Sequence, residues 1–265
     1  MNALPKPYYK DDFVTIYHGD CREIVPLLGK FDLLLTDPPY VHEHMDGGGF
    51  ASARKFYAGG ALSGLNDFDL SVYSEQMLQA SQMLVCFCSR DLVGDYAQLA
   101  KSKNRKFDLH VWHKTNAIPF TANTWKSDLE YICLVWSNKP GWKQHHQSMH
   151  SKAWISSLCT DGAHPACKPI GLLSKYISVF DAQTIIDPFA GSGTTGRAAK
   201  DLGRKCTLIE REERYCEIAA KRMRQEVLLP VAAVAPFKER ELFGTPAEPL
   251  AHLDKHTTRA NIPST

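Results

Sequence analysis

The chain has 265 residues, of which 44% are hydrophobic and 23% are charged, and its formal net charge is +2. This length suits one large α/β domain, and so small a net charge excludes nucleic-acid binding through global charge alone. No run of about 18 apolar residues is present to span a membrane. Residues 1–10 lack the apolar segment of a secretory signal. The eight scattered cysteines do not match zinc spacing, so we expect a reduced, cytoplasmic protein without a metal.

Apolar runs of strand length alternate with helical patterns along the chain. We predict seven strands, at residues 13–17, 31–36, 83–88, 109–112, 131–136, 184–186 and 206–209. Apolar residues at helical spacing predict helices over residues 71–82, 169–179, 194–202 and 212–224. Continuous apolar strands between helices are typical of a mostly parallel sheet that is covered on both faces.

Three stretches do not fit this alternation of strands and helices. Residues 41–65 are rich in Gly, Ala and Ser, residues 137–163 are polar and aromatic, and residues 230–265 form a Pro-rich tail. We expect that tail to be mobile, because it offers little apolar surface to bury.

A glycine-rich turn joins the strand at 184–186 to the helix at 194–202. It reads Ile186-Asp187-Pro188-Phe189-Ala190-Gly191-Ser192-Gly193-Thr194. Glycines let the backbone approach a ligand closely, and a helix N-terminus offers free N–H groups to an anionic group. Glu210 ends the next strand, where a carboxylate can hold both hydroxyls of a ribose. The alternative is a glycine turn that only connects the two elements.

The same glycines raise the question of a nicotinamide enzyme. Gly191, Gly193 and Gly196 fit the dinucleotide pattern G-x-G-x-x-G. In such enzymes the glycine strand starts the nucleotide domain and several strands follow it. Here only one predicted strand and one predicted helix come between the glycine strand-turn-helix unit and the tail, so a dehydrogenase would need an unusual permutation.

The tetrapeptide Asp37-Pro38-Pro39-Tyr40 follows the strand at 31–36, at a carboxyl edge of the sheet, where open α/β sheets bind ligands. An amine conjugated to a purine ring is a poor nucleophile. The Asp37 carboxylate and the Pro38 carbonyl could each accept an amino hydrogen and return electron density to the nitrogen. The two prolines fix this backbone. Tyr40 offers a flat face to an extruded base, a stack worth about 1–3 kcal/mol. A stiff turn that ends a strand is the competing interpretation.

Together, the two motifs resemble the amino-methyltransferases that act on DNA bases. The tetrapeptide precedes the glycine loop, and His164-Pro165-Ala166-Cys167-Lys168-Pro169 precedes the glycine strand, an order that resembles the β group of these enzymes. The family more often has threonine where Ala166 stands. Gly19-Asp20-Cys21 is similar to the family's segment near the cofactor adenine, and residues 112–114 and 130–132 match weaker positions.

The resemblance implies a seven-stranded, mostly parallel Rossmann-like sheet with the last hairpin strand antiparallel, in a catalytic domain over residues 1–229. It implies S-adenosylmethionine as cofactor, with Asp187 on the methionine ammonium, Glu210 on the ribose and Asp20 near the adenine amine. Lys168 would lie near the cofactor carboxylate. The loop around the methionine portion would comprise Phe189, Ala190, Gly191, Ser192, Gly193 and Thr194.

The implied reaction is direct displacement of the methyl group onto N6 of adenine, with no covalent enzyme intermediate and no metal. Because N6 is paired inside double-stranded DNA, the base must first be flipped into the active site. The implied enzyme is encoded by a bacterium or a phage and belongs to restriction-modification.

Residues 137–163 are the candidate target-recognition region. Lys139, Lys143 and Lys152 occur there among tryptophans and without acidic residues before Thr160, a composition that suits contact with phosphates and bases. The region is short, so we expect a short or relaxed recognition sequence, or help from a partner subunit in a homodimer. A polar surface loop is the alternative. The residues at 41–65 are expected to close over the flipped base, with Arg54 and Lys55 meeting DNA. A disordered insertion with no role is the competing interpretation.

Two further charged groups have plainer interpretations. Lys101, Lys103, Arg105 and Lys106 are expected to form a solvated loop. His145 and His146 have no third ligand at metal spacing.

Other functions remain open at this stage. N4-cytosine methylation uses the same chemistry, although that branch usually has Ser in place of Asp37. Enzymes that methylate RNA bases or protein glutamine usually place the glycine motif first and have Asn before the prolines. A DNA-binding regulator that retains a methyltransferase shell without catalysis is the alternative from another class.

Overall fold

The computed structural model describes residues 3–39, 70–117, 126, 128–137, 147–158 and 168–226. The chain divides into two units, Met1–Leu228 and Leu229–Thr265, and every described residue belongs to the first. The loop at 41–65, part of the candidate recognition region and the tail at 230–265 therefore lie outside the described residues. Within the described ranges, no helix combines the length and apolar character that crossing a membrane requires.

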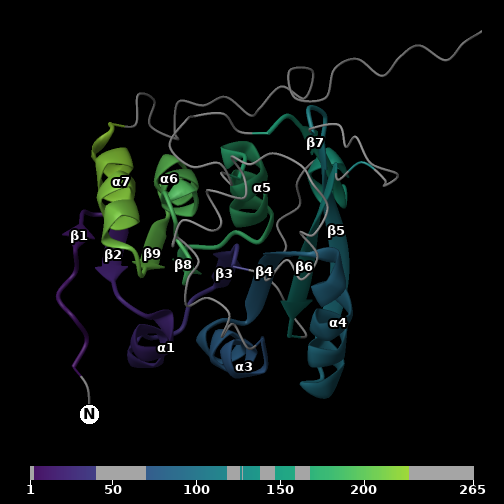
Figure 1. Ribbon diagram of the computed structural model, residues 1–265, viewed down its shortest axis with the longest axis horizontal. Coiled ribbons are helices and arrows are strands. Elements are labelled where there is room, and N and C mark those ends of the chain that lie inside the picture. Colours follow the sequence, from purple (N-terminus) through teal and green to yellow (C-terminus); the bar gives the residue numbers. More distant parts are fainter. Residues whose placement is uncertain are drawn as a thin grey trace, which may run out of the picture. The chain divides into compact units, whose positions relative to one another are not determined.

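The described ranges contain one sheet of nine strands (Figure 1). In chain order these are β1 (Tyr9–Lys10), β2 (Val14–His18), β3 (Leu33–Thr36), β4 (Met83–Cys88), β5 (Lys106–Lys114), β6 (Leu129–Trp136), β7 (Ala153–Ser156), β8 (Thr184–Asp187) and β9 (Lys205–Glu210). Across the sheet the order is β1-β2-β9-β8-β3-β4-β6-β5-β7. Strands β2, β9, β8, β3 and β4 run parallel, whereas β6 is antiparallel to both β4 and β5.

All seven predicted strands are present, and the predicted antiparallel hairpin strand is β6. The predicted number of seven is wrong, because two short strands extend the sheet. β1 has two residues and pairs antiparallel with β2, and β7 has four residues and pairs parallel with β5. Neither strand contains an apolar run that could be recognised in the sequence, because β1 has only two residues and β7 buries only Trp154.

Helices cover both faces of the sheet. α5 (Ile170–Val179), α6 (Thr194–Asp201) and α7 (Glu213–Arg224) lie on one face, and α1 (Cys21–Ile24), α3 (Leu70–Ala80) and α4 (Val93–Ser102) lie on the other (Figure 1). Short 3-10 helices occupy Val25–Leu27, Arg90–Leu92 and Gln147–His150. The four predicted helices are confirmed. α1 and α4 were not predicted, because α1 has four residues and α4 buries only Tyr96 and Ala100.

Each face of the sheet has its own apolar core. Successive residues of β4 point to opposite faces, so Val85 and Phe87 join the core under α5, α6 and α7, whereas Leu84 and Cys86 join the other. All six residues of β4 are buried. Burying one large apolar side chain contributes about 1.5–3 kcal/mol, so two filled faces hold the central strands rigidly. That rigidity fixes the positions of the residues that follow the strands.

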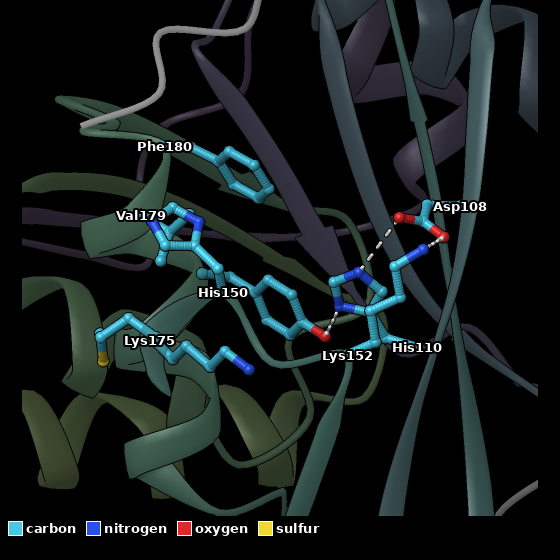
Figure 2. Close-up of a pocket in the computed structure, with 9 residues that line it drawn as sticks. Asp108, His110, His150, Lys152, Lys175, Val179 and Phe180 are labelled. Carbon is cyan, nitrogen blue, oxygen red and sulfur yellow. Dashed lines mark hydrogen bonds and ion pairs between the residues drawn. The ribbon is translucent and has the colours of Figure 1, made fainter. Parts of the chain in front are cut away.

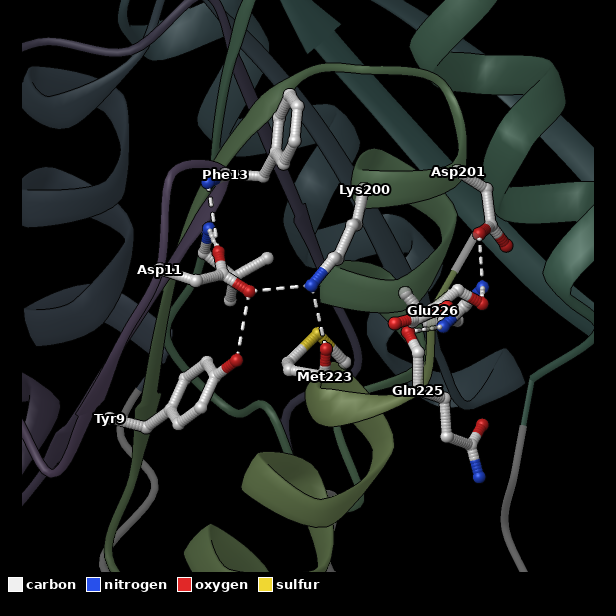
Figure 3. A network of polar contacts seen from close by, with 10 residues as sticks. Tyr9, Asp11, Phe13, Lys200, Asp201, Met223, Gln225 and Glu226 are labelled. Atoms are coloured by element: carbon white, nitrogen blue, oxygen red, sulfur yellow. Dashed lines mark hydrogen bonds and ion pairs between the residues drawn. The ribbon is translucent and has the colours of Figure 1, made fainter. Parts of the chain in front are cut away.

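A polar network fastens α6 and α7 to the N-terminal edge of the sheet (Figure 3). Asp11 accepts hydrogen bonds from the backbone N–H groups of Phe13 and Val14 at 2.8 and 2.6 Å. The ammonium of Lys200 on α6 donates to Asp11 at 2.6 Å and to the carbonyl of Met223 on α7 at 2.6 Å. The helix that follows the glycine loop is therefore held at its far end.

Candidate active site

Four of the predicted acidic residues lie at one edge of the sheet. Strands β2, β9, β8 and β3 are parallel neighbours, so their carboxyl ends share an edge. Asp20 follows β2 and Asp37 follows β3, while Asp187 ends β8 and Glu210 ends β9. Ligands of open α/β sheets bind at this kind of edge. The structure thus brings together carboxylates that are up to 190 residues apart in the chain (210 − 20).

Asp187 is buried and accepts three hydrogen bonds. Its Oδ1 accepts from the Thr36 hydroxyl at 2.7 Å and from the Phe189 N–H at 3.1 Å, and its Oδ2 accepts from the Thr195 hydroxyl at 2.7 Å. Burial raises the pKa of Asp187 to about 6, although these donors act in the opposite direction. This carboxylate ties the end of β3 to the glycine loop and α6. The two threonines were missed from sequence, where nothing but their closeness to the motifs marks them.

The two glycines with left-handed backbone in the loop have different surroundings. Gly191 has φ +49° and Gly193 has φ +79°. A Cβ at Gly193 would lie 2.8 Å from the Cβ of Ala219 on α7, whereas a Cβ at Gly191 would meet no atom of the described residues within 4 Å. Close packing against α7 therefore requires glycine at position 193. At Gly191 the described residues leave open space.

Glu210 holds the other side of this loop. Its Oε2 accepts from the Gly191 N–H at 2.8 Å and its Oε1 accepts from the Glu212 N–H at 2.8 Å. Burial raises its pKa. The Gly19 N–H also donates to the Glu210 carbonyl at 3.0 Å, which joins the end of β2 to the end of β9.

Asp20 lies at the same edge and is held by one neighbour. It caps α1 by accepting from the Arg22 N–H at 2.8 Å and pairs with the Arg22 guanidinium at 2.5 Å. These interactions with Arg22 lower its pKa. The roles of Asp20 and Glu210 toward a cofactor stay predictions.

The remaining residues of the glycine loop are packed into the fold. The Ala190 N–H donates to the Ile209 carbonyl at 3.0 Å. The Phe189 ring lies 5.7 Å from that of Tyr73 on α3. Ser192 and Thr194 are buried, and the Thr194 hydroxyl accepts from Arg222 at 2.9 Å.

Asp37 belongs to a chain of four buried or half-buried charges. Lys168 donates to Asp37 Oδ2, and its Nζ lies 2.8 Å from Glu130 Oε1 as an ion pair. Lys114 Nζ lies 2.9 Å from Glu130 Oε2. The Lys168 ammonium also lies 5.2 Å from the centroid of the Phe87 ring. The sequence predicted Lys168 near a cofactor carboxylate, and the structure shows its ammonium shared by two carboxylates of the protein.

The second oxygen of Asp37 has a different environment. Oδ1 is buried and has no hydrogen-bond partner in the part of the chain that the structure describes. Burial raises the pKa of Asp37, and Lys168 opposes that rise. Leaving a buried acceptor unpaired costs about 1–3 kcal/mol, so an atom in this position calls for a functional explanation. Pro38 is buried and Pro39 is half-buried, and Tyr40 lies outside the described residues.

Of the five predicted DNA-binding residues, Lys152 is described, and Arg54, Lys55, Lys139 and Lys143 lie outside the described ranges. The Lys152 ammonium donates to Asp108 Oδ1 at 2.7 Å, while 63% of its side chain remains exposed. Lys152 and Asp108 border a small cavity between β5 and α5, shared with His110 and Lys175 (Figure 2). A contact of Lys152 with DNA stays a prediction, and such a contact would have to compete with Asp108.

The basic cluster at residues 101–106 includes one side chain, that of Arg105, that binds the protein rather than solvent. Arg105 donates to the carbonyls of Leu78 and Ser81 at 2.7 and 3.3 Å, so it ties α3 to the start of β5. Lys101, Lys103 and Lys106 are exposed. The expectation of a solvated loop is therefore wrong for Arg105, whose guanidinium satisfies carbonyls at a helix end. It is also wrong for Lys101 and Lys106, which are exposed but lie in α4 and at the start of β5.

Six of the cysteines lie in the described ranges, and these are free and buried. Those ranges contain no group of three or more His, Cys, Asp or Glu side chains arranged to hold a metal ion. His145 and His146 lie outside the described residues.

The fold recurs in two solved methyltransferases. The crystal structure of the M1.HpyAVI–SAM complex matches with a TM-score of 0.64 and 24% identity, over 80% of this chain and 100% of that one. The PvuII DNA methyltransferase, which is cytosine-N4-specific, matches with a TM-score of 0.62 and 16% identity, over 85% of this chain and 91% of that one. The fold is therefore that of Rossmann-like methyltransferases.

Sequence comparison identifies the family within that class. The family model described as DNA methylase, which covers N6 and N4 methyltransferases, matches residues 31–221. The Type II methyltransferase M2.MboI of Moraxella bovis is 30% identical over 250 residues, which cover 82% of this chain and 90% of that protein. M.HinfI of Haemophilus influenzae is 29% identical over 81% of this chain and 70% of that protein. The chain belongs to the DNA methylase family, and the resemblance drawn from its motifs is confirmed.

Proposed function

We propose that this DNA methyltransferase transfers a methyl group from S-adenosylmethionine to N6 of adenine in double-stranded DNA, by direct displacement after base flipping. The observation that carries the proposal is the buried Oδ1 of Asp37 at the carboxyl edge of the sheet, to which no described residue donates a hydrogen bond. An amino hydrogen of a flipped base is the partner that this acceptor lacks. The polarised amine then has the electron density that attack on the methyl group requires.

The residues at the edge fit S-adenosylmethionine. Asp187 supplies a buried carboxylate for the methionine ammonium, and Gly191 borders open space for the methionine portion. Glu210 and Asp20 flank that loop, where they would hold the ribose and the adenine amine. Bound S-adenosylmethionine supplies a methyl group that is already activated on a sulfonium. The protein's part is to orient the donor, hold the amine and exclude water.

The choice of adenine rests on the residue before the prolines. Asp37 and the Pro38 carbonyl offer two acceptors for the two amino hydrogens, which adenine N6 and cytosine N4 both carry, so the preference for adenine comes from Asp37 itself. The N4-cytosine branch usually has Ser at this position. The fold does not decide the base, because the PvuII enzyme of similar fold is specific for cytosine N4. The product of the reaction therefore has to be measured.

DNA contacts are proposed for Lys152, Lys139, Lys143, Arg54 and Lys55, and stacking on the base for Tyr40. The candidate recognition region at 137–163 is short, so a homodimer in which a partner subunit helps to read the site is part of the proposal. M2.MboI and M.HinfI come from bacteria, whose DNA lies in the cytoplasm, and we expect this chain to act there as part of a restriction-modification system.

The test is methylation of duplex DNA with labelled S-adenosylmethionine, followed by nucleoside mass spectrometry. We expect N6-methyladenine from the wild type. Asp37→Asn should lower the methyl transfer rate by about 100-fold or more, because an amide accepts amino hydrogens poorly. Calorimetry should show S-adenosylmethionine affinity within about threefold of wild type, since Asp37 acts on the amine.

Asp91→Asn is the matched control, because 81% of the Asp91 side chain is exposed and it should change neither quantity. Finding N4-methylcytosine alone would overturn the base and leave the fold and family standing. Label in RNA or protein, with none in DNA, would overturn the substrate class.

A further inference from the structure

We propose that Glu130 is a positioning residue for methyl transfer, which keeps Asp37 a strong acceptor for the amino group by sharing the Lys168 ammonium with it. The inference rests on the proposed role of Asp37. It adds a residue that neither motif contains, since Glu130 lies on β6, more than 90 residues after Asp37 (130 − 37).

The charges alternate along the chain of contacts. Asp37 follows β3, Lys168 precedes α5, Glu130 lies on β6 and Lys114 ends β5. Lys168 contacts Asp37 and lies 2.8 Å from Glu130, and Lys114 lies 2.9 Å from Glu130. The side chains of Lys168 and Glu130 are only 9% and 10% exposed. Solvent therefore screens these interactions weakly.

A purely structural ion-pair network would be an inefficient way to stabilise this edge. Burying a charge costs free energy, and well-packed apolar residues often stabilise a core equally well. A network built for stability would also satisfy each of its buried atoms. Here Asp37 keeps one oxygen on Lys168 and leaves Oδ1 buried without a described partner. This arrangement orients the carboxylate and reserves one oxygen for a ligand.

Glu130 limits how far Lys168 neutralises Asp37. An ammonium that paired with Asp37 alone would withdraw negative charge from the carboxylate and weaken it as an acceptor. Glu130 competes for the same ammonium, and Lys114 in turn compensates Glu130. Burial raises the pKa of Asp37, and the negative charge of Glu130 adds to that rise, whereas Lys168 and Lys114 lower the pKa.

Among the described residues, further titratable groups that interact with Asp37 come from β8 and β4. Asp187 on β8 has its own raised pKa through burial. The thiol of Cys86 has a pKa that burial raises, and that of Cys88 has a pKa raised by its hydrogen bond with Cys133 and by burial, so both thiols stay neutral. The pH–rate profile has an acid limb, the pH range in which the rate falls as the pH is lowered. A change in the position of that limb can therefore be assigned to the carboxylates.

Two substitutions should move the pH dependence in opposite directions. The measurement is the single-turnover methyl transfer rate against pH at saturating S-adenosylmethionine and duplex DNA. In Glu130→Gln the acid limb should move to lower pH, and the plateau rate should fall on the order of tenfold to a hundredfold because Asp37 becomes a weaker acceptor. In Lys114→Met the acid limb should move to higher pH, because a positive charge that lowers the pKa of Asp37 is removed. Affinities for cofactor and DNA should stay within about threefold in both variants.

Glu75→Gln is the matched control. Glu75 pairs with Lys103 at 3.1 Å on the surface, with 60% of its side chain exposed, and its loss should move neither the limb nor the rate. Glu130→Asp, which keeps the charge, should restore the position of the acid limb. It also carries the test if Glu130→Gln does not fold.

An unchanged acid limb in Glu130→Gln, or limbs that move in the same direction in Glu130→Gln and Lys114→Met, would overturn the proposal. A rate loss matched by an equal loss of cofactor affinity would also overturn it. These failures are separable from failure of the proposed function. If the wild type yields N4-methylcytosine, the base assignment fails, whereas normal kinetics in Glu130→Gln with N6-methyladenine as product refutes only the role of Glu130.

Discussion

Asp187 is a buried carboxylate with a structural role, and the proposed function adds a second role, binding of the cofactor's ammonium group. Its oxygens accept from Thr36, Phe189 and Thr195, yet burial holds its pKa at about 6. Near neutral pH the residue therefore carries a negative charge that the protein's neutral donors compensate only in part. A cationic ligand group would complete that compensation.

This predicts a pH-dependent affinity for S-adenosylmethionine. Ionised Asp187 attracts the methionine ammonium and protonated Asp187 does not, so affinity should fall as pH drops through about 6. Below that pH the fall should approach about tenfold per pH unit. Isothermal titration calorimetry between pH 5 and 7 measures it.

Asp187→Asn is the control for this effect. The amide fits the same hydrogen bonds to Thr36 and Phe189, so the fold should persist. Affinity should be about tenfold lower or worse at pH 7 and nearly independent of pH below it. An equal pH slope in the variant and the wild type would show that another group controls binding.

Sequence reasoning found some residues of the site and missed others for a physical reason. Asp37 and Glu210 were predicted because each ends or follows an apolar strand, and parallel strands bring such residues to one edge. Asp187 was predicted through the resemblance to the family. Glu130 and Lys114 were not assigned a role, because the ion pairs that join them to Asp37 run between separate elements. The pairing of β5 with β6 brings Lys114 to Glu130, and the segment before α5 brings Lys168 to Glu130 and Asp37.

At the scale of elements, two glycines in the turn between β8 and α6 have different roles. Gly191 is proposed to border the cofactor, whereas Gly193 packs against α7. Gly191→Ala should leave the chain folded, at a cost of about 1–2 kcal/mol for a left-handed alanine. Its methyl group would project into open space, where it should weaken S-adenosylmethionine binding. Gly193→Ala should lower the free energy of unfolding by more than Gly191→Ala does, because its Cβ would meet Ala219 at 2.8 Å.

Denaturant unfolding and cofactor titration of the two variants test this contrast. Gly94→Ala is the control, since its Cβ would meet nothing within 4 Å and it lies in α4 with ordinary helical backbone. It should raise stability by up to about 1 kcal/mol. If Gly193→Ala proved as stable as wild type and only lost cofactor affinity, the packing role of Gly193 would be refuted.

The elements themselves were largely predictable, and all of their exceptions but α4, which has ten residues and buries only Tyr96 and Ala100, share one cause. Long apolar strands such as β4 and β6 and the amphipathic helices α5 and α7 carry periodic signals. β1, β7 and α1 have between two and four residues, too few for a period to be seen. Their positions come from tertiary contacts, such as the tie between Asp11 and Lys200, rather than from local propensity.

At the scale of the molecule, we place the boundary of the catalytic domain near residue 229. The acidic edge and both apolar cores lie before it, and Arg197 anchors the end of α7 by donating to the Gln225 carbonyl at 2.8 Å (Figure 3). Removing residues 230–265 should therefore keep S-adenosylmethionine affinity within about twofold and the Tm within about 3 °C. Calorimetry and thermal unfolding of the shortened chain check this, and loss of cofactor binding would move the boundary.

The pairing of β2 with β9 affects how the enzyme folds during its synthesis on the ribosome. Val14 is aligned with Cys206 and His18 with Glu210. Strand β2 is synthesised early, but its partner β9 is among the last strands to be synthesised. Strands β3, β4, β5 and β6 can pair while translation continues, but β2 cannot take its place before β9 has emerged. Asp20, Asp187 and Glu210 gather only at that moment. With the proposed roles of these three residues, we expect that a nascent chain does not bind the methyl donor before β9 has emerged, and that the activity appears in one late step.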